Sequence, residues 1–107
     1  MKIEEVGLKD DNDKLRFELI TVDSLKELAK VLTYGANKYK PNSWQNVEDG
    51  EDKHYASLLR HIFAWRNGES IDEESGLTHL GHAMANIMFL IYHDKNKKVK
   101  DDTNPRK

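Results

Sequence analysis

The longest uncharged stretch of the chain predicts a buried helix. Residues 75–92 contain no Asp, Glu, Lys or Arg, although 34% of the whole chain is charged. Apolar side chains recur in this stretch with helical spacing, at Leu80, Met84, Ile87 and Ile91. Because the helix has no charged face, we expect other helices or a second copy of the chain to enclose it.

A second stripe of the same helix is polar. His79, His82 and Asn86 follow one another at i, i+3 and i+7, so they share one face. A buried polar group without a hydrogen-bond partner costs about 1–3 kcal/mol. One buried His is more often an ordinary core residue, but three polar groups on one face indicate a site. A membrane span is disfavoured, because these groups would be costly in lipid and the stretch is barely long enough.

A helix is also predicted near the start of the chain. It begins at a capping box, Ser24 to Glu27, or one turn earlier at Thr21 or Asp23. Its apolar stripe consists of Leu25, Leu28, Leu32 and Tyr39. Gly35 interrupts this helix, which indicates either the close approach of a neighbour or ligand, or a glycine tolerated near a helix end.

The middle helix is predicted over residues 53–67 and is followed by Gly68, a favoured residue just after a helix. Its broad apolar surface consists of Tyr55, Leu58, Leu59, Ile62, Phe63 and Trp65. The composition of residues 40–52 predicts a loop that carries Trp44. We expect this ring to pack on the core, with the lining of a ligand pocket as the alternative.

The domain organisation follows from these elements. Residues 15–95 form a single all-α domain, with a flexible segment at 1–14 and a charged tail at 96–107. Residues 15–20 alternate apolar and charged, which predicts a short extended segment docked on the body. Three such helices cannot enclose one another, so we expect a homo-oligomer in which the helices at 53–67 and 77–95 pair across a symmetry axis.

Composition narrows the class of protein. The net charge of −2 argues against nucleic acid as a partner. The chain has no Cys, which excludes disulfides, thiolate metal sites and a cysteine nucleophile. No apolar leader follows Met1, so an intracellular, cytoplasmic protein is expected.

Candidate chemistry gathers around the last two predicted helices. His61, the carboxylates at 69–74 and the polar stripe lie at the two ends of one helix–loop–helix, and imidazoles with carboxylates are ligands of divalent metals. The acidic run has an ordinary alternative as a solvated stretch before a helix. Arg16, Lys38 and Arg60 are candidates for binding phosphate. Arg60 stands in an apolar helix, where it needs an acidic partner or an anionic ligand.

The order of these residues resembles a known family. The matching residues are Thr33 to Tyr39, Trp44, Arg60 to Trp65, Gly68, Glu69, Asp72, Glu74 to Gly76, His79 to Ala83 and Asn86. They resemble the phage and bacterial family named for the N-terminal domain of dATP/dGTP diphosphohydrolase, which is similar to MazG-like, all-α nucleotide pyrophosphohydrolases. The match runs from about residue 14 to 92. It departs at Ser43, where the family pattern has Asn.

The resemblance implies a MazG-like helical bundle that acts as a dimer or tetramer. It implies that a purine nucleotide such as dATP or dGTP is cleaved, with Mn²⁺ or Mg²⁺, into a monophosphate and pyrophosphate. The implied catalytic residues are His61, Glu69, Asp72 and Glu74. The implied metal ligands are His79, His82, Glu69 and Asp72. The implied substrate-binding residues are Arg16, Lys38, Tyr39, Trp44, Arg60 and Asn86.

One feature departs from MazG-like enzymes, which gather metals with Glu-x-x-Glu and Glu-x-x-Asp. Here His79 and His82 take the place of the second motif, and residues 53–67 contain no Glu-x-x-Glu. Such ligands favour Mn²⁺ or another imidazole-tolerant ion over Mg²⁺. Two alternatives therefore stay open. One is a non-catalytic phage protein that sequesters a nucleotide or a nucleotide-derived signalling molecule, and the other is a structural oligomer with a buried polar network.

Overall fold

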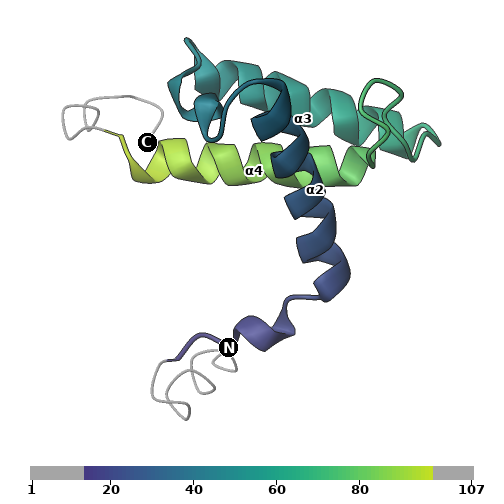
Figure 1. The fold of residues 1–107 in the computed structure, drawn as a ribbon, viewed down its shortest axis with the longest axis horizontal. Helices are drawn as coiled ribbons and strands as arrows, with labels where there is room; N and C mark the ends of the chain where they lie inside the picture. The colour runs from purple at the N-terminus through teal and green to yellow at the C-terminus, as the bar shows by residue number, and fades with distance from the viewer. Residues whose placement is uncertain (1–13, 98–107) are drawn as a thin grey trace, which may run out of the picture.

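A computed structural model of the protein describes residues 14–97. Within this range the chain forms α2 (Val22–Lys38), α3 (Gly50–Arg66) and α4 (His79–Lys95), with short 3-10 turns η1 (Phe17–Leu19) and η2 (Ser43–Asn46). Helices α3 and α4 run antiparallel side by side, and α2 crosses α4 (Figure 1). The expected all-α fold is confirmed. The expected flexible segment and charged tail fall almost entirely outside the described residues.

The helix boundaries follow from local hydrogen bonds. The hydroxyl of Thr21 accepts a hydrogen bond from Ser24 N at 3.2 Å, so α2 begins at the earlier of the expected caps. The hydroxyl of Thr78 accepts one from Gly81 N at 3.0 Å and starts α4 there. Helix α3 begins at Gly50, three residues before the expected start at 53. Gly68 has a φ of 100°, as expected of the residue that ends this helix.

The prediction that residues 15–20 form an extended segment docked on the body is wrong. Phe17–Leu19 form the turn η1, and this part of the chain projects from the start of α2, away from α3 and α4 (Figure 1). Alternating side chains specify a strand only where another strand can pair with it, and the described residues form no sheet. Local bonds satisfy the backbone instead, from Leu19 N to Arg16 O and from Ile20 N to Phe17 O, both at 3.1 Å.

Within one chain, helix α4 is buried through its small and polar residues, whereas the sequence predicts that other helices or a second copy of the chain enclose the whole helix. Its buried residues are His79, Gly81, Ala83, Ala85 and Asn86. The predicted apolar stripe is open within one chain, since Leu80, Ile87 and Ile91 are 42–54% exposed. The reason is that small side chains let the neighbouring helices approach closely, which turns the apolar stripe outwards.

Helices α2 and α4 approach each other closely at Gly81. A Cβ atom there would lie 3.1 Å from the backbone oxygen of Glu27 and 3.3 Å from Cγ2 of Val31. The hydroxyl of Thr78 donates a hydrogen bond of 2.7 Å to the Glu27 carboxylate at the same point. Gly35 differs, because no atom lies within 4 Å of a Cβ added there. Among residues 14–97, therefore, no neighbour approaches Gly35.

Trp44 packs on the core, as predicted. Its ring stacks on Phe89 with centroids 4.3 Å apart and meets Tyr92 edge-on at 5.0 Å. His54 adds a contact of 3.2 Å between its Nε2 and the backbone oxygen of Trp44. These contacts hold η2 and its flanking loop against α3 and α4. In the described part of the chain, no helix has the length and apolar character needed to cross a membrane.

Two glycine-to-alanine changes test this packing. Gly81→Ala is expected to destabilise the protein by about 1–3 kcal/mol, because backbone atoms of α2 block the added methyl group. Gly35→Ala is the matched control, and is expected to stabilise by about 0.5–1 kcal/mol because alanine favours the helix and meets no atom. Urea unfolding followed by circular dichroism measures both. A Gly81→Ala protein as stable as the parent would contradict the close contact.

Candidate functional site

A cavity of about 1160 Å³ lies between α2 and the α3–α4 pair. Its walls come from the last turns of α2, the loop around η2, the inner faces of α3 and α4, and the loop that joins these two helices. Among the predicted site residues, it is lined by Lys38, Tyr39, Trp44, Arg60, His61, Asp72, Glu74, His79, His82 and Asn86. The fold therefore brings together all of the predicted residues except Arg16 and Glu69.

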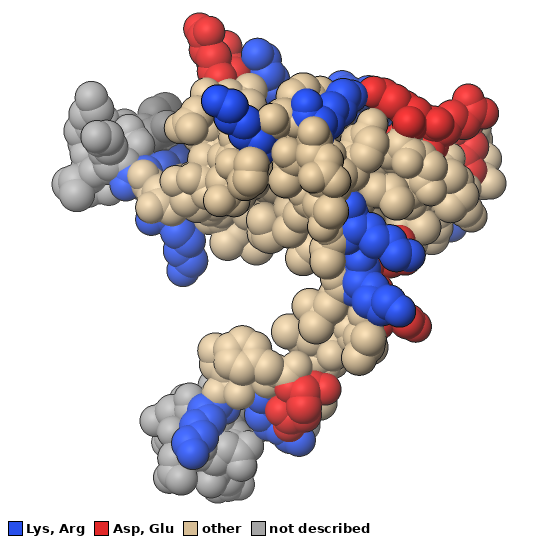
Figure 2. All heavy atoms as spheres, viewed as in Figure 1, with Lys and Arg blue, Asp and Glu red and all other residues tan. Residues whose placement is uncertain are grey.

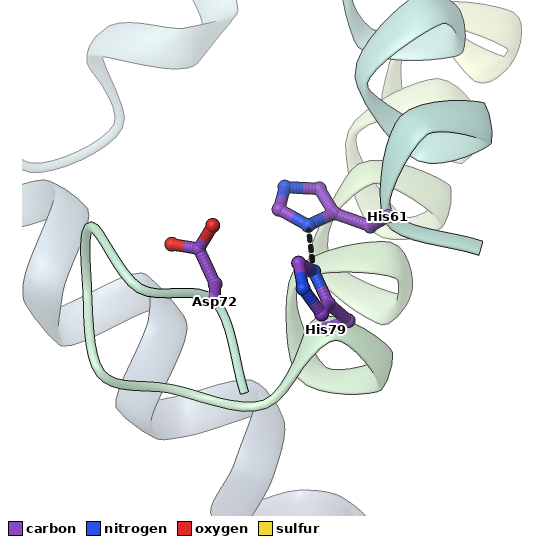
Figure 3. Close-up of side chains that lie close together, drawn as sticks. All are labelled: His61, Asp72 and His79. Atoms are coloured by element: carbon purple, nitrogen blue, oxygen red, sulfur yellow. Dashed lines mark hydrogen bonds between the residues drawn. The ribbon is translucent and has the colours of Figure 1, made fainter. Parts of the chain in front are cut away.

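Three candidate metal ligands meet at one end of the cavity. One nitrogen each from His61 and His79 and one carboxylate oxygen from Asp72 lie within 4.8 Å of one another. The Nδ1 atoms of the two imidazoles are only 2.9 Å apart, with Asp72 beside them (Figure 3). In the free protein one of these nitrogens must carry a proton that the other accepts. With a metal ion between them, both could present lone pairs.

The loop at 67–78 places Asp72 over the two histidines. It folds back on itself through a bond from Asp72 N to Leu77 O at 2.8 Å and another from His79 N to Ser70 O at 2.9 Å. Gly76, with a φ of 75°, makes the reversal possible, because residues with side chains rarely adopt this conformation. The capping of α4 by Thr78 then makes His79 the first residue of the helix.

Ser75 forms hydrogen bonds that stabilise this loop and orient the ring of His82. Both its backbone N–H and its hydroxyl donate to Asp72 Oδ2, at 3.0 and 2.8 Å. The Ser75 hydroxyl oxygen also lies 2.7 Å from His82 Nε2. Since ionised Asp72 only accepts, we assign the proton of this contact to His82 Nε2, which leaves His82 Nδ1 with a bare lone pair. The His82 ring lies parallel to that of His61, with centroids 4.5 Å apart.

Sequence reasoning did not assign a role to Ser75. The available signal was its spacing, since a Ser three residues after an Asp in a polar loop commonly closes an Asx-type turn. His82 was also predicted to be a metal ligand, but the structure does not place it in the ligand group. His82 contacts Ser75 and lies 3.7 Å from Asp72, whereas the three grouped ligands are His61, Asp72 and His79.

Two of the predicted carboxylates lie at the edge of this group. Glu69 is exposed, and its Oε1 lies 3.7 Å from Nε2 of His79, an atom that is buried without a hydrogen-bond partner. Glu74 is exposed and forms an ion pair with Lys38 at 2.8 Å. Figure 2 shows acidic side chains gathered at the end of the molecule where this loop lies. Among the described residues, Asp72 is thus the carboxylate that lies within 4.8 Å of both imidazoles of the group.

The surroundings set the charges needed for metal binding. Burial, with further repulsion from His82, lowers the pKa of His61 to about 4. Burial also lowers the pKa of His82. Burial raises the pKa of Asp72, but the two hydrogen bonds from Ser75 and the nearby histidines outweigh it and leave that pKa below its usual value. At neutral pH, therefore, His61 and His82 are neutral and Asp72 is ionised, as metal ligation requires.

The candidate phosphate-binding cations are placed differently from one another. Lys38 reaches the cavity from the end of α2, and its hydrogen bond to Glu74 raises its pKa. Arg60 lines the cavity and is exposed. Its guanidinium has no ion pair among the described residues, so of the two expected partners the anionic ligand stays a prediction. Arg16 directly precedes η1, pairs with Glu18 at 2.9 Å, and does not line the cavity.

Asn86 and the aromatic residues form the remaining predicted positions. Asn86 is buried and donates to Ser57 Oγ and to the backbone oxygen of His82, both at 3.0 Å, so it joins α3 to α4 below the cavity. Trp44 lines the cavity and its ring stacks on Phe89. Tyr39 also lines the cavity and is exposed. The assignment of these residues to substrate binding stays a prediction.

A second histidine pair, His54 and His93, lies outside the metal-ligand group. Their rings stack with centroids 5.4 Å apart, beside Trp44. Nε2 of His93 is buried without a hydrogen-bond partner. No carboxylate joins this pair among the metal-ligand groups of the described residues. Its contacts with Trp44 and Phe89 give it a packing role.

The lowered histidine pKa values predict a pH-dependent stability. Between the usual imidazole pKa of 6.5 and the value of about 4 for His61, the unfolded chain binds more protons than the folded one. The free energy of unfolding should therefore fall as the pH is lowered from 7.5 to about 5. Urea titrations in a chelating buffer measure this, and His61→Gln should show a smaller loss. Equal unfolding midpoints at the two pH values would contradict the lowered pKa values.

Comparison with known proteins identifies the family. Residues 4–103 match the family model described as "dATP/dGTP diphosphohydrolase, N-terminal". The chain is 30% identical over 96 residues to a protein of Salmonella phage PMBT28 named dATP/dGTP diphosphohydrolase, an alignment that covers 90% of this chain and 32% of that protein. The chain thus spans about a third of the length of this relative. No solved structure matches. The resemblance noted in the sequence is confirmed, and the chain belongs to the dATP/dGTP diphosphohydrolase N-terminal family.

Proposed function

We propose that this protein is a metal-dependent nucleotide diphosphohydrolase that cleaves a purine deoxynucleoside triphosphate into a monophosphate and pyrophosphate. The observation that carries the proposal is the group of His61, Asp72 and His79 in a cavity that Lys38 and Arg60 also line. The names of the family and of the phage relative support dATP or dGTP as the substrate.

The ligand group fits a divalent ion. Two imidazoles and one carboxylate suit Mn²⁺ better than Mg²⁺, which prefers oxygen ligands. If His61 and His79 bind through the facing Nδ1 atoms, each carries its proton on Nε2. The Nε2–H of His79 would then point to a carboxylate 3.7 Å away on Glu69. A carboxylate behind a ligating histidine commonly orients the ring, so Glu69 becomes a positioning residue instead of a ligand.

A metal ion at this place would neutralise phosphate charge and make a bound water more acidic. The residues of the chain supply the other requirements of the reaction. Lys38 and Arg60 hold the phosphates, and the water oxygen forms a bond to the α-phosphorus as the bond to the leaving pyrophosphate breaks. His82, whose Nδ1 is left bare by the contact with Ser75, accepts the proton of the water in this scheme.

The base lies, in this proposal, towards the aromatic end of the cavity. Tyr39 is exposed there and offers an uncovered ring, whereas one face of Trp44 is already covered by Phe89. Gly35 lines the same wall and leaves space along α2. Purine stacking on Tyr39 with the ribose near Gly35 is the arrangement that this space favours.

The proposal includes a homo-oligomer that works inside a bacterial host cell. Leu80, Ile87 and Ile91 form an exposed apolar stripe on α4, and Tyr55 and Trp65 add exposed rings on α3. Pairing of these faces between two copies would remove them from water. The phage origin of the relative supports the location.

Binding without hydrolysis is a second candidate, and a specific observation favours it. The ligand group contains a single carboxylate, Asp72, where the related enzymes use several. The chain also spans only a third of the length of the phage relative. A protein of this kind would hold a nucleotide, or a signalling molecule derived from one, in the same cavity.

Incubation of the purified protein with dATP or dGTP and Mn²⁺ tests the proposed reaction. Chromatography should show the monophosphate and pyrophosphate, and both should disappear with a chelator. His79→Ala and Asp72→Asn should abolish Mn²⁺ binding in calorimetry, and Glu69→Gln should weaken it by about 10–100-fold.

Glu73→Gln is the matched control for this experiment, because Glu73 lies in the same loop, is exposed and does not line the cavity. It should bind Mn²⁺ like the parent protein. Unchanged nucleotides that stay bound through gel filtration would favour the second candidate. Parental activity of His79→Ala would refute the metal-ligand group.

Lys38 and Glu74 allow a separate test of phosphate binding, with inorganic tripolyphosphate as the probe. Lys38→Met should weaken its binding, because the cation is lost. Glu74→Gln should strengthen it, because phosphate no longer competes with this carboxylate for the Lys38 ammonium. Lys30→Met is the control, since Lys30 pairs with Glu27 on the same helix but outside the cavity lining. Weaker binding by Glu74→Gln would contradict the competition.

A further inference from the structure

A buried amide lines the cavity, and the proposed reaction does not use it. Asn86 is one of the lining residues, although only 6% of its surface is exposed. It lies seven residues after His79 on α4, which places it about 10 Å along the helix axis from the metal-ligand group. Phe89, one turn further along α4, carries the ring of Trp44, and both also line the cavity. Asn86 therefore stands between the metal-ligand group and the aromatic end.

Hydrogen bonds fix the orientation of this amide. The side-chain atom that lies 3.0 Å from the backbone oxygen of His82 must be the nitrogen, because a carbonyl oxygen only accepts hydrogen bonds. The same nitrogen donates to Ser57 Oγ, also at 3.0 Å, so both of its N–H groups are used. The amide oxygen of Asn86 accepts no hydrogen bond from any group within residues 14–97.

The amide oxygen of Asn86 is open to the cavity. In the part of the chain that the structure describes, two side-chain polar atoms are fully enclosed without a hydrogen-bond partner, Nε2 of His79 and Nε2 of His93. The Asn86 oxygen is not one of them, so it is accessible, and the open space beside Asn86 is the cavity. A fixed acceptor without a donor suits a ligand that brings an N–H group, because pairing removes the cost of an unmade hydrogen bond.

Ser57 on α3 supplies a donor next to this acceptor. Its oxygen accepts the hydrogen bond from Asn86, which leaves the hydroxyl hydrogen available for another group. No side chain or backbone group among the described residues accepts this hydrogen. Ser57 also lines the cavity. The bond between Ser57 and Asn86 therefore holds an unpaired donor and an unpaired acceptor beside each other.

We propose that Asn86 and Ser57 bind the edge of the purine base. The Asn86 amide oxygen accepts an N–H of the base, and the Ser57 hydroxyl donates to the ring nitrogen or oxygen beside that N–H. Adenine offers its amino group next to N1, and guanine offers N1–H next to O6, so both purines carry the complementary pair. The inference rests on the proposed function, because it names the base contacts of the same cavity.

Calorimetric titration in a chelating buffer tests this contact, because metal-dependent cleavage does not occur there. The probes are dATP and the triphosphate of purine deoxyriboside, which lacks the amino group of adenine. The parent protein should bind dATP about tenfold more tightly than the analogue or better, because the analogue leaves the Asn86 oxygen without a donor. Asn86→Ala should abolish this preference, and a general loss of stability would not change the ratio of the two affinities.

Ser57→Ala provides a second variant in case Asn86→Ala does not fold. It removes the hydroxyl, while Asn86 keeps its bond to the backbone of His82. It should bind dATP about three- to tenfold more weakly than the parent. Ser57→Thr retains the hydroxyl and should restore the affinity. Ser70→Ala is the matched control, since Ser70 is exposed and does not line the cavity.

Two results would overturn the base contact. One is equal affinity of the parent protein for dATP and the analogue, and the other is a parent protein that binds neither. The proposed reaction is judged separately, by incubation of dATP with Mn²⁺. Preference for dATP without cleavage would refute the reaction and support the base contact, whereas cleavage without preference would refute the base contact alone.

Discussion

The contact of α4 with its two neighbours governs the rest of the structure. Helix α4 approaches α2 through Gly81, where even a methyl group would meet the backbone of Glu27. Its other small buried residues, Ala83 and Ala85, keep the bundle tight around the helix. This close packing has two consequences. It carries polar side chains into the interior, and it leaves the larger apolar side chains of α4 facing outwards.

The buried polar side chains explain the site. Burial keeps His61 neutral, and His79 faces it with the same ring nitrogen at 2.9 Å. In the free protein this contact depends on a single shared proton, and Nε2 of His79 has no hydrogen-bond partner. A divalent ion would engage both Nδ1 lone pairs and would give the Nε2–H of His79 a carboxylate neighbour in Glu69. The free-energy cost of burying these histidines is then offset by the binding of the ion.

The sequence predicted the helices well, because their caps and breakers are local signals. The start of α2 at Thr21 and the end of α3 at Gly68 both follow from short-range patterns. The order of residues from Thr33 to Asn86 also indicated the correct family. The burial of α4 was harder to predict, since a hydrophobic stripe normally marks the inner face. Here Gly81 and the alanines decide the inner face instead, and helix approach is a tertiary property.

The arrangement of the site residues also depends on tertiary contacts that sequence spacing does not predict. Helical spacing placed His79 and His82 on one face, but it could not separate a residue in the ligand group from one held by Ser75. That distinction depends on how the loop before α4 folds over the histidines. Arg16 illustrates a related difficulty. Its type suits phosphate binding, yet it directly precedes η1 and does not line the cavity of its own chain.

Anomalous diffraction from crystals grown with Mn²⁺ tests the central claim most directly, because it locates the ion independently of activity. We expect a peak between His61, Asp72 and His79, with ring nitrogens and a carboxylate oxygen as its nearest protein atoms. A Mn²⁺ peak at the His54–His93 pair, or no ordered ion at all, would contradict it.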